Sequence, residues 1–216
     1  MSENIKKVPA VVVKRLPRYY RYLGELMKQG IKRISSNALS VKMNVTASQI
    51  RQDFNYFGGF GQQGYGYNVE HLHSEIGEIL GLNDGDTTVI VGAGNLGRAL
   101  ASHNTFEKRG FKLIGIFDND KSIIGTVING VEVMSVDALE DFLRANRVDI
   151  GILTVPKAAV VETAERLVKC GVKGLMNFSY TELNFDKRVA VENVHLSDPL
   201  MTLSYKIKQN KNEELT

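Results

Sequence analysis

An apolar run from Thr88 to Val91 leads directly into the glycine pattern Gly92-Ala93-Gly94-Asn95-Leu96-Gly97, and few folds accommodate glycines at this spacing. The first glycine suits a tight turn after a strand, the second lets the backbone approach a pyrophosphate, and the third lets a helix pack closely on the strand. The N-terminus of that helix presents free N–H groups and the positive end of its dipole. The pattern therefore predicts a strand, a turn and a helix that together bind a dinucleotide.

An acidic residue stands where the ribose of such a dinucleotide needs one. Asp118 closes a second apolar run, Phe111 to Phe117, and lies 21 residues beyond Gly97. A carboxylate at this position binds the ribose 2′-OH and repels a 2′-phosphate, so the sequence favours NAD(H) over NADP(H). The alternative is a glycine-rich turn that only connects a strand to a helix, with Asp118 as an ordinary surface residue.

The charge is distributed unevenly along the chain. Residues 1–60 hold eleven Lys and Arg against three acidic residues, a net charge of +8. Because the whole chain carries +3, the other 156 residues sum to −5. Such asymmetry indicates a polyanionic partner for the N-terminal part, nucleic acid above all. A solvated basic surface without a partner is the alternative.

Other features exclude several classes of protein. The single cysteine, Cys170, rules out an intrachain disulfide and any CxxC redox or zinc site. No apolar run approaches the roughly 20 residues that span a bilayer. The stretch from Ala10 to Val13 is too short for a signal peptide. We therefore expect a cytoplasmic protein with no membrane segment and no metal.

The basic N-terminal part has the pattern of a helix-turn-helix. Apolar spacing predicts a helix between Pro9 and Gln29 that is kinked by Pro17 or begins near Leu16. Ser35 or Ser36 caps a short second helix, and a third begins at Thr46 with the spacing of a capping box. Two short helices joined by a brief turn are typical of DNA-binding proteins, although most short helix pairs bind no DNA.

The third helix presents polar side chains suited to reading bases. Arginine can form two hydrogen bonds with guanine, and glutamine or asparagine can do so with adenine in the major groove. The expected contacts on its exposed face are Ser48, Gln49, Arg51, Gln52 and Asn55.

The segment from Phe57 to Tyr67 interleaves glycines with aromatic residues. It predicts a wing of two short strands around a flexible tip, because a plain glycine linker seldom carries aromatic residues that favour burial. A helix from Val69 to Leu80 then bridges to the next domain. We place a DNA-binding domain at residues 1–82.

After residue 85 strands and helices alternate, which predicts a parallel sheet covered by helices on both faces. Ligands of such sheets bind beyond the carboxyl ends of the strands. Thr154-Val155-Pro156 and Asn177 follow two of these strands and would form the floor of a dinucleotide crevice. We place this Rossmann domain at residues 83–196. It includes an expected helix from Leu96 to Arg109.

A final helix begins at Asp198, with Pro199 in its first turn. Leu200, Leu203 and Ile207 give it an apolar side. That side packs either on its own domain or on a partner subunit. The sequence leaves both possibilities open for residues 197–216.

The combination of these motifs resembles the Rex redox-sensing transcriptional repressors of bacteria. The resemblance runs from about Lys7 to Ile207 and covers the basic helix-turn-helix, the glycine-rich wing and the glycine turn. The segments that carry it are Arg15-Leu16-Pro17, Arg51-Gln52-Asp53-Phe54-Asn55-Tyr56-Phe57-Gly58, Gly92 to Gly97, Thr154-Val155-Pro156, Gly174-Leu175-Met176-Asn177-Phe178 and Ala190-Val191-Glu192-Asn193-Val194.

The resemblance implies a homodimer with an N-terminal winged-helix domain, a doubly wound Rossmann domain, and a C-terminal helix exchanged between subunits. It further implies binding to a palindromic operator in double-stranded DNA, repression of genes of fermentation and anaerobic respiration, and release when NADH binds. NAD⁺ is expected to compete without the same effect.

Position by position, the resemblance assigns Arg51 and Gln52 to base or phosphate contacts, supported by Ser48 and Tyr56. The complete expected DNA-binding set is Lys14, Arg15, Ser48, Gln49, Arg51, Gln52, Asn55, Tyr56 and Gly58. The complete expected cofactor set is Gly92, Ala93, Gly94, Asn95, Leu96, Gly97, Asp118, Thr154, Val155, Pro156 and Asn177.

Two other functions compete with this interpretation. A small NAD-dependent dehydrogenase would need an acid or base beside the nicotinamide, and His71, His73 and His195 are the available candidates. The remaining length accommodates no separate substrate domain. A DNA-binding protein whose Rossmann domain only holds a dimer together is the third possibility.

Overall fold

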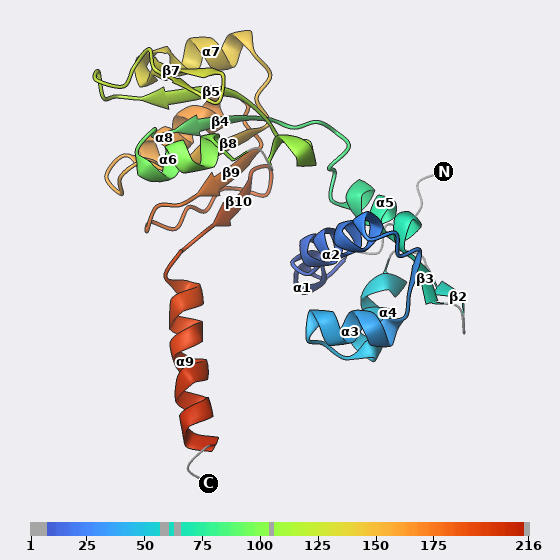
Figure 1. Cartoon of the computed structure of the whole chain (residues 1–216). Helices are drawn as coiled ribbons and strands as arrows, with labels where there is room; N and C mark the ends of the chain where they lie inside the picture. The colour runs from blue at the N-terminus through green and yellow to red at the C-terminus, as the bar shows by residue number, and fades with distance from the viewer. Residues whose placement is uncertain (1–7, 57–60, 63–65, 104–105, 214–216) are drawn as a thin grey trace. The chain divides into compact units, whose positions relative to one another are not determined.

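The fold is that of a computed structural model, which describes residues 8–56, 61–62, 66–103 and 106–213 (Figure 1). The chain divides into two compact units, Met1–Asp84 and Gly85–Thr216. Each unit has its own hydrophobic core, so each is described separately. Within the described residues, no helix is long and apolar enough to cross a membrane.

The first unit combines five helices with a small antiparallel sheet. Leu16, Leu23, Ile50, Phe54 and Leu72 are among the residues of its core. The strands follow the order β1-β3-β2. The helices are α1 (Ala10–Val13), α2 (Leu16–Lys28), α3 (Ser36–Met43), α4 (Ala47–Asn55) and α5 (Val69–Ile79), and the strands are β1 (Arg33–Ile34), β2 (Gly61–Gln62) and β3 (Gly66–Asn68).

Local sequence signals determine where these helices begin and end. Helix α2 begins at Leu16 with Pro17 in its first turn, where the missing N–H of proline costs no hydrogen bond. Ser35 Oγ accepts a hydrogen bond from Ala38 N and caps α3, which ends at Asn44 in the left-handed conformation. Thr46 Oγ1 accepts from Gln49 N and caps α4. The predicted helix-turn-helix is therefore present as α3 and α4.

The paired strands β2 and β3 lie where the sequence predicts a wing. Gly66 has a φ of +70°, and a Cβ there would stand 2.7 Å from the Ile34 carbonyl oxygen, so glycine is needed for β3 to approach β1. Residues 57–60 and 63–65 lie outside the described residues. The expected DNA contact Gly58 is one of them.

The second unit is built on a seven-stranded sheet in the order β10-β9-β8-β4-β5-β7-β6. The pairs from β10 to β7 are parallel, and β6 runs antiparallel to β7. This is the predicted Rossmann-like arrangement. The strands are β4 (Thr87–Val91), β5 (Lys112–Asp118), β6 (Val127–Ile128), β7 (Val131–Ser135), β8 (Ile150–Leu153), β9 (Gly174–Asn177) and β10 (Ala190–Asn193).

Helices cover both faces of this sheet (Figure 1). Val89 and Val91 point to the face packed by α7 (Leu139–Ala145) and α8 (Val160–Lys169). Ile90, between them, points to the opposite face with α6 (Asn95–Ala101). This alternation follows from the two-residue period of a strand.

The helix expected from Leu96 to Arg109 is shorter than predicted. Helix α6 ends at Ala101, and a separate 3₁₀ turn, η1 (Glu107–Arg109), follows. Ser102, Asn104 and Thr105 stand between them, and such side chains favour helix ends and turns over helix interiors. A second 3₁₀ turn, η2 (Val136–Ala138), precedes α7.

The last helix, α9 (Asp198–Glu213), leaves its apolar side chains in solvent. Leu200 is 68% exposed, Tyr205 62% and Leu203 52%. Burying side chains of this size contributes about 1.5–3 kcal/mol each. Within its own chain, α9 does not obtain this stabilisation.

Candidate functional site

The three glycines of the turn between β4 and α6 have different steric surroundings. Gly92 has a φ of +100°, and a Cβ there would lie 2.7 Å from the Thr154 carbonyl oxygen. A Cβ on Gly97 would lie 1.9 Å from the Gly92 carbonyl oxygen, so the helix packs on the turn only because this side chain is absent. Gly94 has nothing within 4 Å of its Cβ position. Its backbone therefore borders open space that a ligand can enter.

Asp118, at the end of β5, is bonded to this turn. Its carboxylate accepts hydrogen bonds from Ala93 N at 2.5 Å and from Asp120 N at 2.8 Å. The residue expected to bind a ribose therefore also anchors the glycine turn. Each carboxylate oxygen keeps a second lone pair for a hydroxyl donor.

A cavity of about 400 Å³ opens in front of the turn. It lies at the carboxyl ends of β4, β5 and β8, where open α/β sheets bind their ligands. Its lining carries three acidic residues and a single cation, Arg166. The lining residues are Val91, Gly92, Gly94, Asp118, Asn119, Asp120, Ile123, Val136, Thr154, Val155, Pro156, Ala159, Glu162, Thr163 and Arg166.

Most of the expected cofactor residues meet at this cavity. Gly92, Gly94, Asp118 and the Thr154-Val155-Pro156 segment line it. The other members of the pattern, Ala93, Asn95, Leu96 and Gly97, belong to the turn and to the first turn of α6. No phosphate ligand is needed to hold the turn, since Thr154 Oγ1 donates to the Gly92 carbonyl at 2.6 Å.

Asn177 lies elsewhere. Its side chain is fully buried and holds the loop between β9 and β10, because Nδ2 donates to Thr181 O at 2.7 Å and to Asn193 Oδ1 at 2.8 Å. Its Oδ1 accepts from Ser179 N at 2.9 Å. With these atoms committed to the loop, Asn177 is not part of the cavity lining.

Sequence reasoning missed part of the cavity lining. This part comes from Ile123, from Val136 in η2, from Ala159 just before α8, and from Thr163 and Arg166 within α8. The apolar pattern of a helix indicates only which of its faces is buried. It does not indicate that residues of α8 line the same cavity as Asp118 at the end of β5.

Arg166 and Glu140 form a bidentate ion pair between α8 and α7. Arg166 Nε and Nη2 donate to the two Glu140 oxygens at 2.5 and 2.7 Å, and Nη2 also donates to Val136 O at 2.8 Å. The hydrogen bonds from Arg166 lower the pKa of Glu140 to about 2, and Glu140 raises the pKa of Arg166. Both groups are therefore charged at neutral pH.

In the first unit, α4 carries five of the nine residues expected to contact DNA, and four of these five are exposed. Ser48, Arg51, Gln52 and Asn55 are exposed, and Tyr56 is half-buried at the helix end. Arg51 Nη1 donates to Ser36 Oγ at 3.1 Å, which leaves other guanidinium donors available. Lys14 is exposed between α1 and α2. These side chains offer hydrogen-bond groups without first breaking a buried contact.

Arg15 and Gln49 are engaged differently. Both donate to the fully buried carboxylate of Asp53, Arg15 through two bonds of 2.7 Å and Gln49 through Nε2 at 2.9 Å. The hydroxyl of Tyr19 donates to the same carboxylate at 2.7 Å. Burial alone would raise the pKa of Asp53, but these hydrogen bonds outweigh burial and hold the pKa below its usual value.

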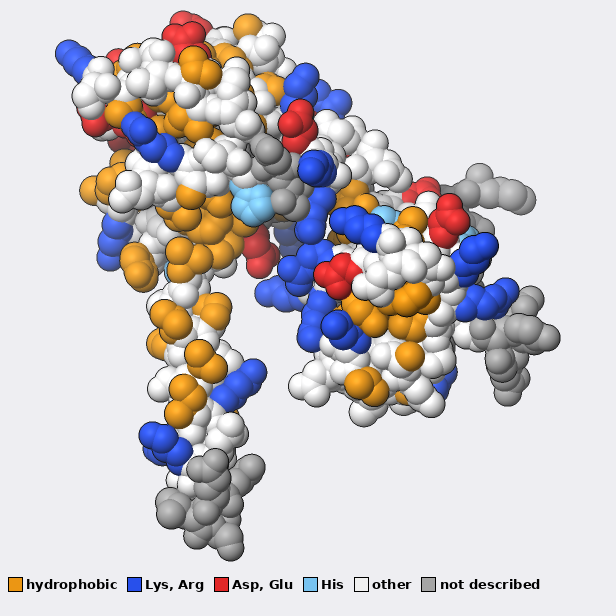
Figure 2. All heavy atoms as spheres, in the orientation of Figure 1, with side chains coloured by type: hydrophobic (Ala, Val, Ile, Leu, Met, Phe, Trp, Pro, Cys, Tyr) orange, Lys and Arg blue, Asp and Glu red, His pale blue; other side chains and the backbone are white. Residues whose placement is uncertain are grey.

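The positive charge of this unit is concentrated in the segment that contains α1 to α4. Residues 8–56 contain nine Lys and Arg against Glu25 and Asp53, and Asp53 is buried and paired. Figure 2 shows Lys and Arg side chains, in blue, recurring over the surface of the unit that carries α3 and α4. A surface of this kind attracts a polyanion such as DNA.

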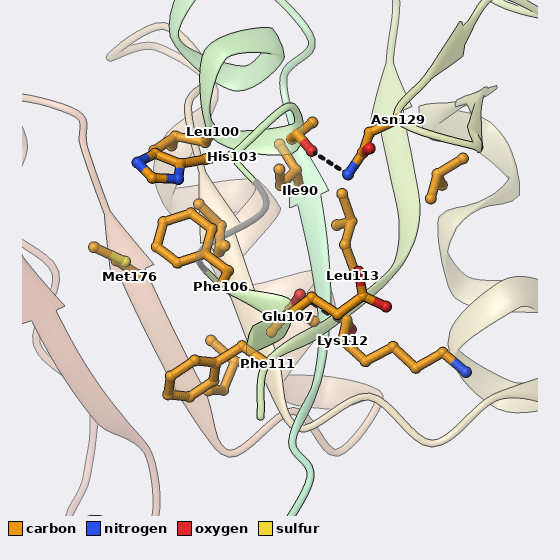
Figure 3. A pocket seen from close by; sticks show the side chains of 15 residues that line it. Ile90, Leu100, His103, Phe106, Glu107, Phe111, Lys112, Leu113, Asn129 and Met176 are labelled. Atoms are coloured by element: carbon orange, nitrogen blue, oxygen red, sulfur yellow. Dashed lines mark hydrogen bonds between the residues drawn. The ribbon is translucent and has the colours of Figure 1, made fainter. Parts of the chain in front are cut away.

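A second cavity of about 430 Å³ lies on the sheet face that α6 covers, and it shares no lining residue with the first. Figure 3 shows Phe106 and Phe111 along one side and Leu113 and Asn129 on the other. Asn129 Nδ2 donates to Ala101 O at 3.2 Å, so this polar group is already bonded. The cavity is largely apolar and carries no glycine turn for a phosphate.

Comparisons with known proteins find relatives of both units. Residues 7–55 match the family model described as "Putative DNA-binding protein N-terminus", and residues 83–181 match "CoA binding domain". The chain is 55% identical to the redox-sensing transcriptional repressor Rex of Thermoanaerobacter pseudethanolicus over 95% of this chain and 92% of that protein. It is 52% identical to Rex of Clostridioides difficile over 95% of this chain and 98% of that protein.

Solved structures of similar proteins also match nearly the whole chain. The structure of RSP in complex with β-NAD⁺ and operator DNA matches with a TM-score of 0.88 and 54% identity, over 96% of this chain and 95% of that one. The structure of RSP in complex with β-NADH matches with a TM-score of 0.89 and 50% identity, over 98% of this chain and all of that one. On this identity across nearly its whole length, the chain belongs to the Rex family of redox-sensing transcriptional repressors.

Proposed function

We propose that this chain binds a palindromic operator as a homodimer and releases it when NADH occupies the cavity beside Gly94. One observation carries the proposal: the chain combines two features. One is a glycine turn with open space at Gly94 and the carboxylate of Asp118 beside it, and the other is a basic helix-turn-helix. RSP, which is similar over nearly the whole chain, has been solved with NAD⁺ and operator DNA and with NADH. A repressor family is not an enzyme family, so the dehydrogenase alternative is set aside.

The cofactor roles follow from the turn geometry. The pyrophosphate lies against the backbone of Gly92, Ala93 and Gly94 and receives hydrogen bonds from the N-terminus of α6, including Asn95 and Leu96. Gly97 allows α6 to approach. Asp118 accepts the ribose hydroxyls, and Thr154-Val155-Pro156 lies beneath the nicotinamide half. Asn177 acts indirectly, by holding the loop between β9 and β10.

The DNA roles separate into base contacts, phosphate contacts and supporting residues. Ser48, Arg51, Gln52 and Asn55 read base edges from the exposed side of α4, which we take as the recognition helix. Lys14, Tyr56 and Gly58 contact the phosphate backbone. Arg15 and Gln49 act through Asp53, because their donors already bond to its carboxylate.

Sensing requires a difference in affinity between two states. NADH shifts the protein from DNA-bound to free only if it binds the free arrangement more tightly. Moving the population from nearly all bound to nearly all free needs about 5.5 kcal/mol of such difference. Two cofactors per dimer share this free energy, about half each. NAD⁺ competes for the cavity without favouring the free arrangement.

The exposed apolar side of α9 supports the homodimer. Leu200, Leu203 and Tyr205 would be covered by a second copy of the chain, with the helix exchanged between subunits. The apolar cavity lined by Ile152, Phe106 and other residues adds further surface for such packing. Replacing Leu203 by Glu should shift the dimer to monomer in analytical ultracentrifugation. An unchanged dimer would contradict this role for α9.

A gel-shift titration on a palindromic promoter site tests the sensor. NADH should weaken operator binding at concentrations where NAD⁺ does not, and equal weakening by both would refute the proposal. The salt concentration must be constant, because phosphate contacts make the affinity steeply dependent on ionic strength. Saturable NADH binding in a fluorescence titration separates the sensor from a Rossmann domain that only holds the dimer together.

A further inference from the structure

Hydrogen bonds from neighbouring strand ends hold the first part of the glycine turn. Gly92 N donates to Phe117 O at 2.8 Å, and the Gly92 carbonyl accepts from Thr154 Oγ1 at 2.6 Å. Ala93 N donates to the carboxylate of Asp118 at 2.5 Å. The two peptide groups that flank Gly92 are therefore fixed by residues at the ends of β5 and β8.

The next peptide group, between Ala93 and Gly94, is held by a side chain of α6. Arg98 Nε donates to the Ala93 carbonyl at 2.9 Å, and this is the hydrogen bond that the described residues give to the group. Side chains on a helix lean toward its N-terminus, so Arg98 reaches back to the turn that precedes α6. Its backbone N–H also donates to the Gly94 carbonyl at 2.9 Å, which fixes the side chain's point of attachment.

Without the contact from Arg98, the peptide group between Ala93 and Gly94 can rotate. The peptide bond is trans, so the Gly94 N–H points away from the side on which the Ala93 carbonyl is held. Gly94 has a φ of −68°, and a flipped peptide group would give it a positive φ, which glycine adopts readily. The residue that leaves space for a ligand therefore also permits a wrong orientation of its own N–H.

We propose that Arg98 is a positioning residue for the cofactor, which holds the Ala93 carbonyl and so keeps the Gly94 N–H turned toward the bound pyrophosphate. Gly94 lines the cavity and Arg98 does not, so Arg98 acts through the peptide group and not by touching the ligand. This inference rests on the proposed function. It adds the interaction that keeps the turn in its binding conformation before the cofactor arrives.

Stopped-flow fluorescence of NADH binding to the full-length protein tests this role. If only a fraction of the free protein has the Gly94 N–H correctly oriented, the apparent affinity falls by that fraction. Arg98→Met should therefore lower the association rate and the affinity about fivefold, the loss expected for one hydrogen bond, and leave the dissociation rate unchanged. Arg98→Lys keeps the charge but has no nitrogen at the Nε position, so it should lose nearly as much.

The charge of Arg98 offers a different explanation, in which it only attracts the cofactor. Hydrogen bonds from Ser122 lower the pKa of Asp120, and the charge of Arg98 lowers it further, so this charge acts near the cavity that Asp120 lines. In that case Arg98→Lys restores the association rate, and added salt removes the difference between Arg98→Met and the wild type. Either result overturns the inference.

Two other outcomes would also overturn it. A faster dissociation of NADH from Arg98→Met would indicate that Arg98 touches the ligand directly. A lower melting temperature with both rates unchanged would indicate a role in stability alone. The matched control is Arg144→Met, which breaks the exposed pair with Asp141 on α7 and should change neither rate. If Arg98→Met fails to fold, the association rate of Arg98→Lys at low and high salt decides the question.

The outcome also separates this inference from the function on which it rests. A wild-type protein that binds no NADH overturns the proposed function and this role together. A wild-type protein that binds NADH, with an Arg98→Met variant that associates equally fast, overturns only the role of Arg98.

Discussion

Arg15 and Asp53 form a bidentate ion pair that joins the start of α2 to helix α4. Arg15 Nε and Nη2 lie 2.7 Å from the two carboxylate oxygens, and the Asp53 side chain is fully buried. Tyr19, also buried, donates to the same carboxylate at 2.7 Å. The placement of α4 against α2 therefore depends on a buried carboxylate that bonds to both helices.

Replacing Asp53 by Ala should destabilise the first unit by about 3 kcal/mol, since it leaves the Arg15 guanidinium partly buried without its partner. Urea unfolding followed by a probe in that unit measures the change. Asp141→Ala, which breaks the exposed pair with Arg144, is the control and should cost less than about 1 kcal/mol. Equal costs for the two variants would show that burial adds nothing to the Asp53 pair.

The glycine turn offers two alanine substitutions that should differ in their effect on stability. Gly94→Ala should leave the melting temperature nearly unchanged, because its Cβ enters open space, and should weaken NADH binding at least tenfold by blocking the pyrophosphate. Gly97→Ala should lower the melting temperature as well, because its Cβ collides with the Gly92 carbonyl. Calorimetry and NADH fluorescence measured on both variants give the comparison. NADH binding that survives Gly94→Ala would place the cofactor elsewhere.

Base contacts, phosphate contacts and supporting residues should differ in their salt dependence. Gln52→Ala should cost about 1–3 kcal/mol of operator binding and relax the base preference at one position. Lys14→Ala should weaken binding to all sequences and reduce the salt slope by about 1. Arg15→Ala should weaken operator binding through the position of α4, with no change in the salt slope. Gel shifts at several salt concentrations distinguish these three cases.

The pair of Glu140 and Arg166 should lose its contribution to stability in acid. The pKa of Glu140 is lowered to about 2 from an ordinary value of 4.5. A lowered carboxyl pKa gives stability that is complete above the unfolded pKa and is lost as the pH falls toward the folded pKa. The difference in unfolding free energy between wild type and Glu140→Gln should therefore be constant above pH 5 and shrink between pH 4.5 and 2. A difference that stays constant down to pH 2 would contradict the ion pair.

Local features of the fold could be predicted wherever the residues that determine them lie within one short segment of the sequence. Pro17 belongs to the first turn of a helix, and α2 begins at Leu16. Thr46 has the side chain that caps α4. The alternation of strand and helix patterns after residue 85 predicts a parallel sheet, because parallel strands are joined by long crossover connections that are usually helices.

The extent of the helix after Gly97 was predicted less well. Its apolar spacing continues past Ala101, but the helix ends there with Ser102 as its C-cap, a residue type whose side chain competes for backbone hydrogen bonds. The hydrogen bonds that Asn177 and Gln49 make within the protein were missed for a related reason. Both residues occupy positions where polar side chains often bind ligands. Only the folded structure shows that their side chains are within hydrogen-bond distance of other residues of the protein.

By itself, the sequence determined the two units, the helix-turn-helix, the glycine turn and Asp118 at the end of its strand, since each depends on residues a few positions apart or on the order of strands. Only the tertiary structure decided that Arg15 and Gln49 bond to Asp53, that Asn177 holds a loop, and that Arg166 reaches the cavity with Glu140 behind it. Arg15 and Asp53 are 38 residues apart, and Arg166 and Glu140 are 26 apart. Such partners meet because helices pack at particular angles, and no local pattern in the sequence encodes which charged side chains that packing brings within hydrogen-bond distance.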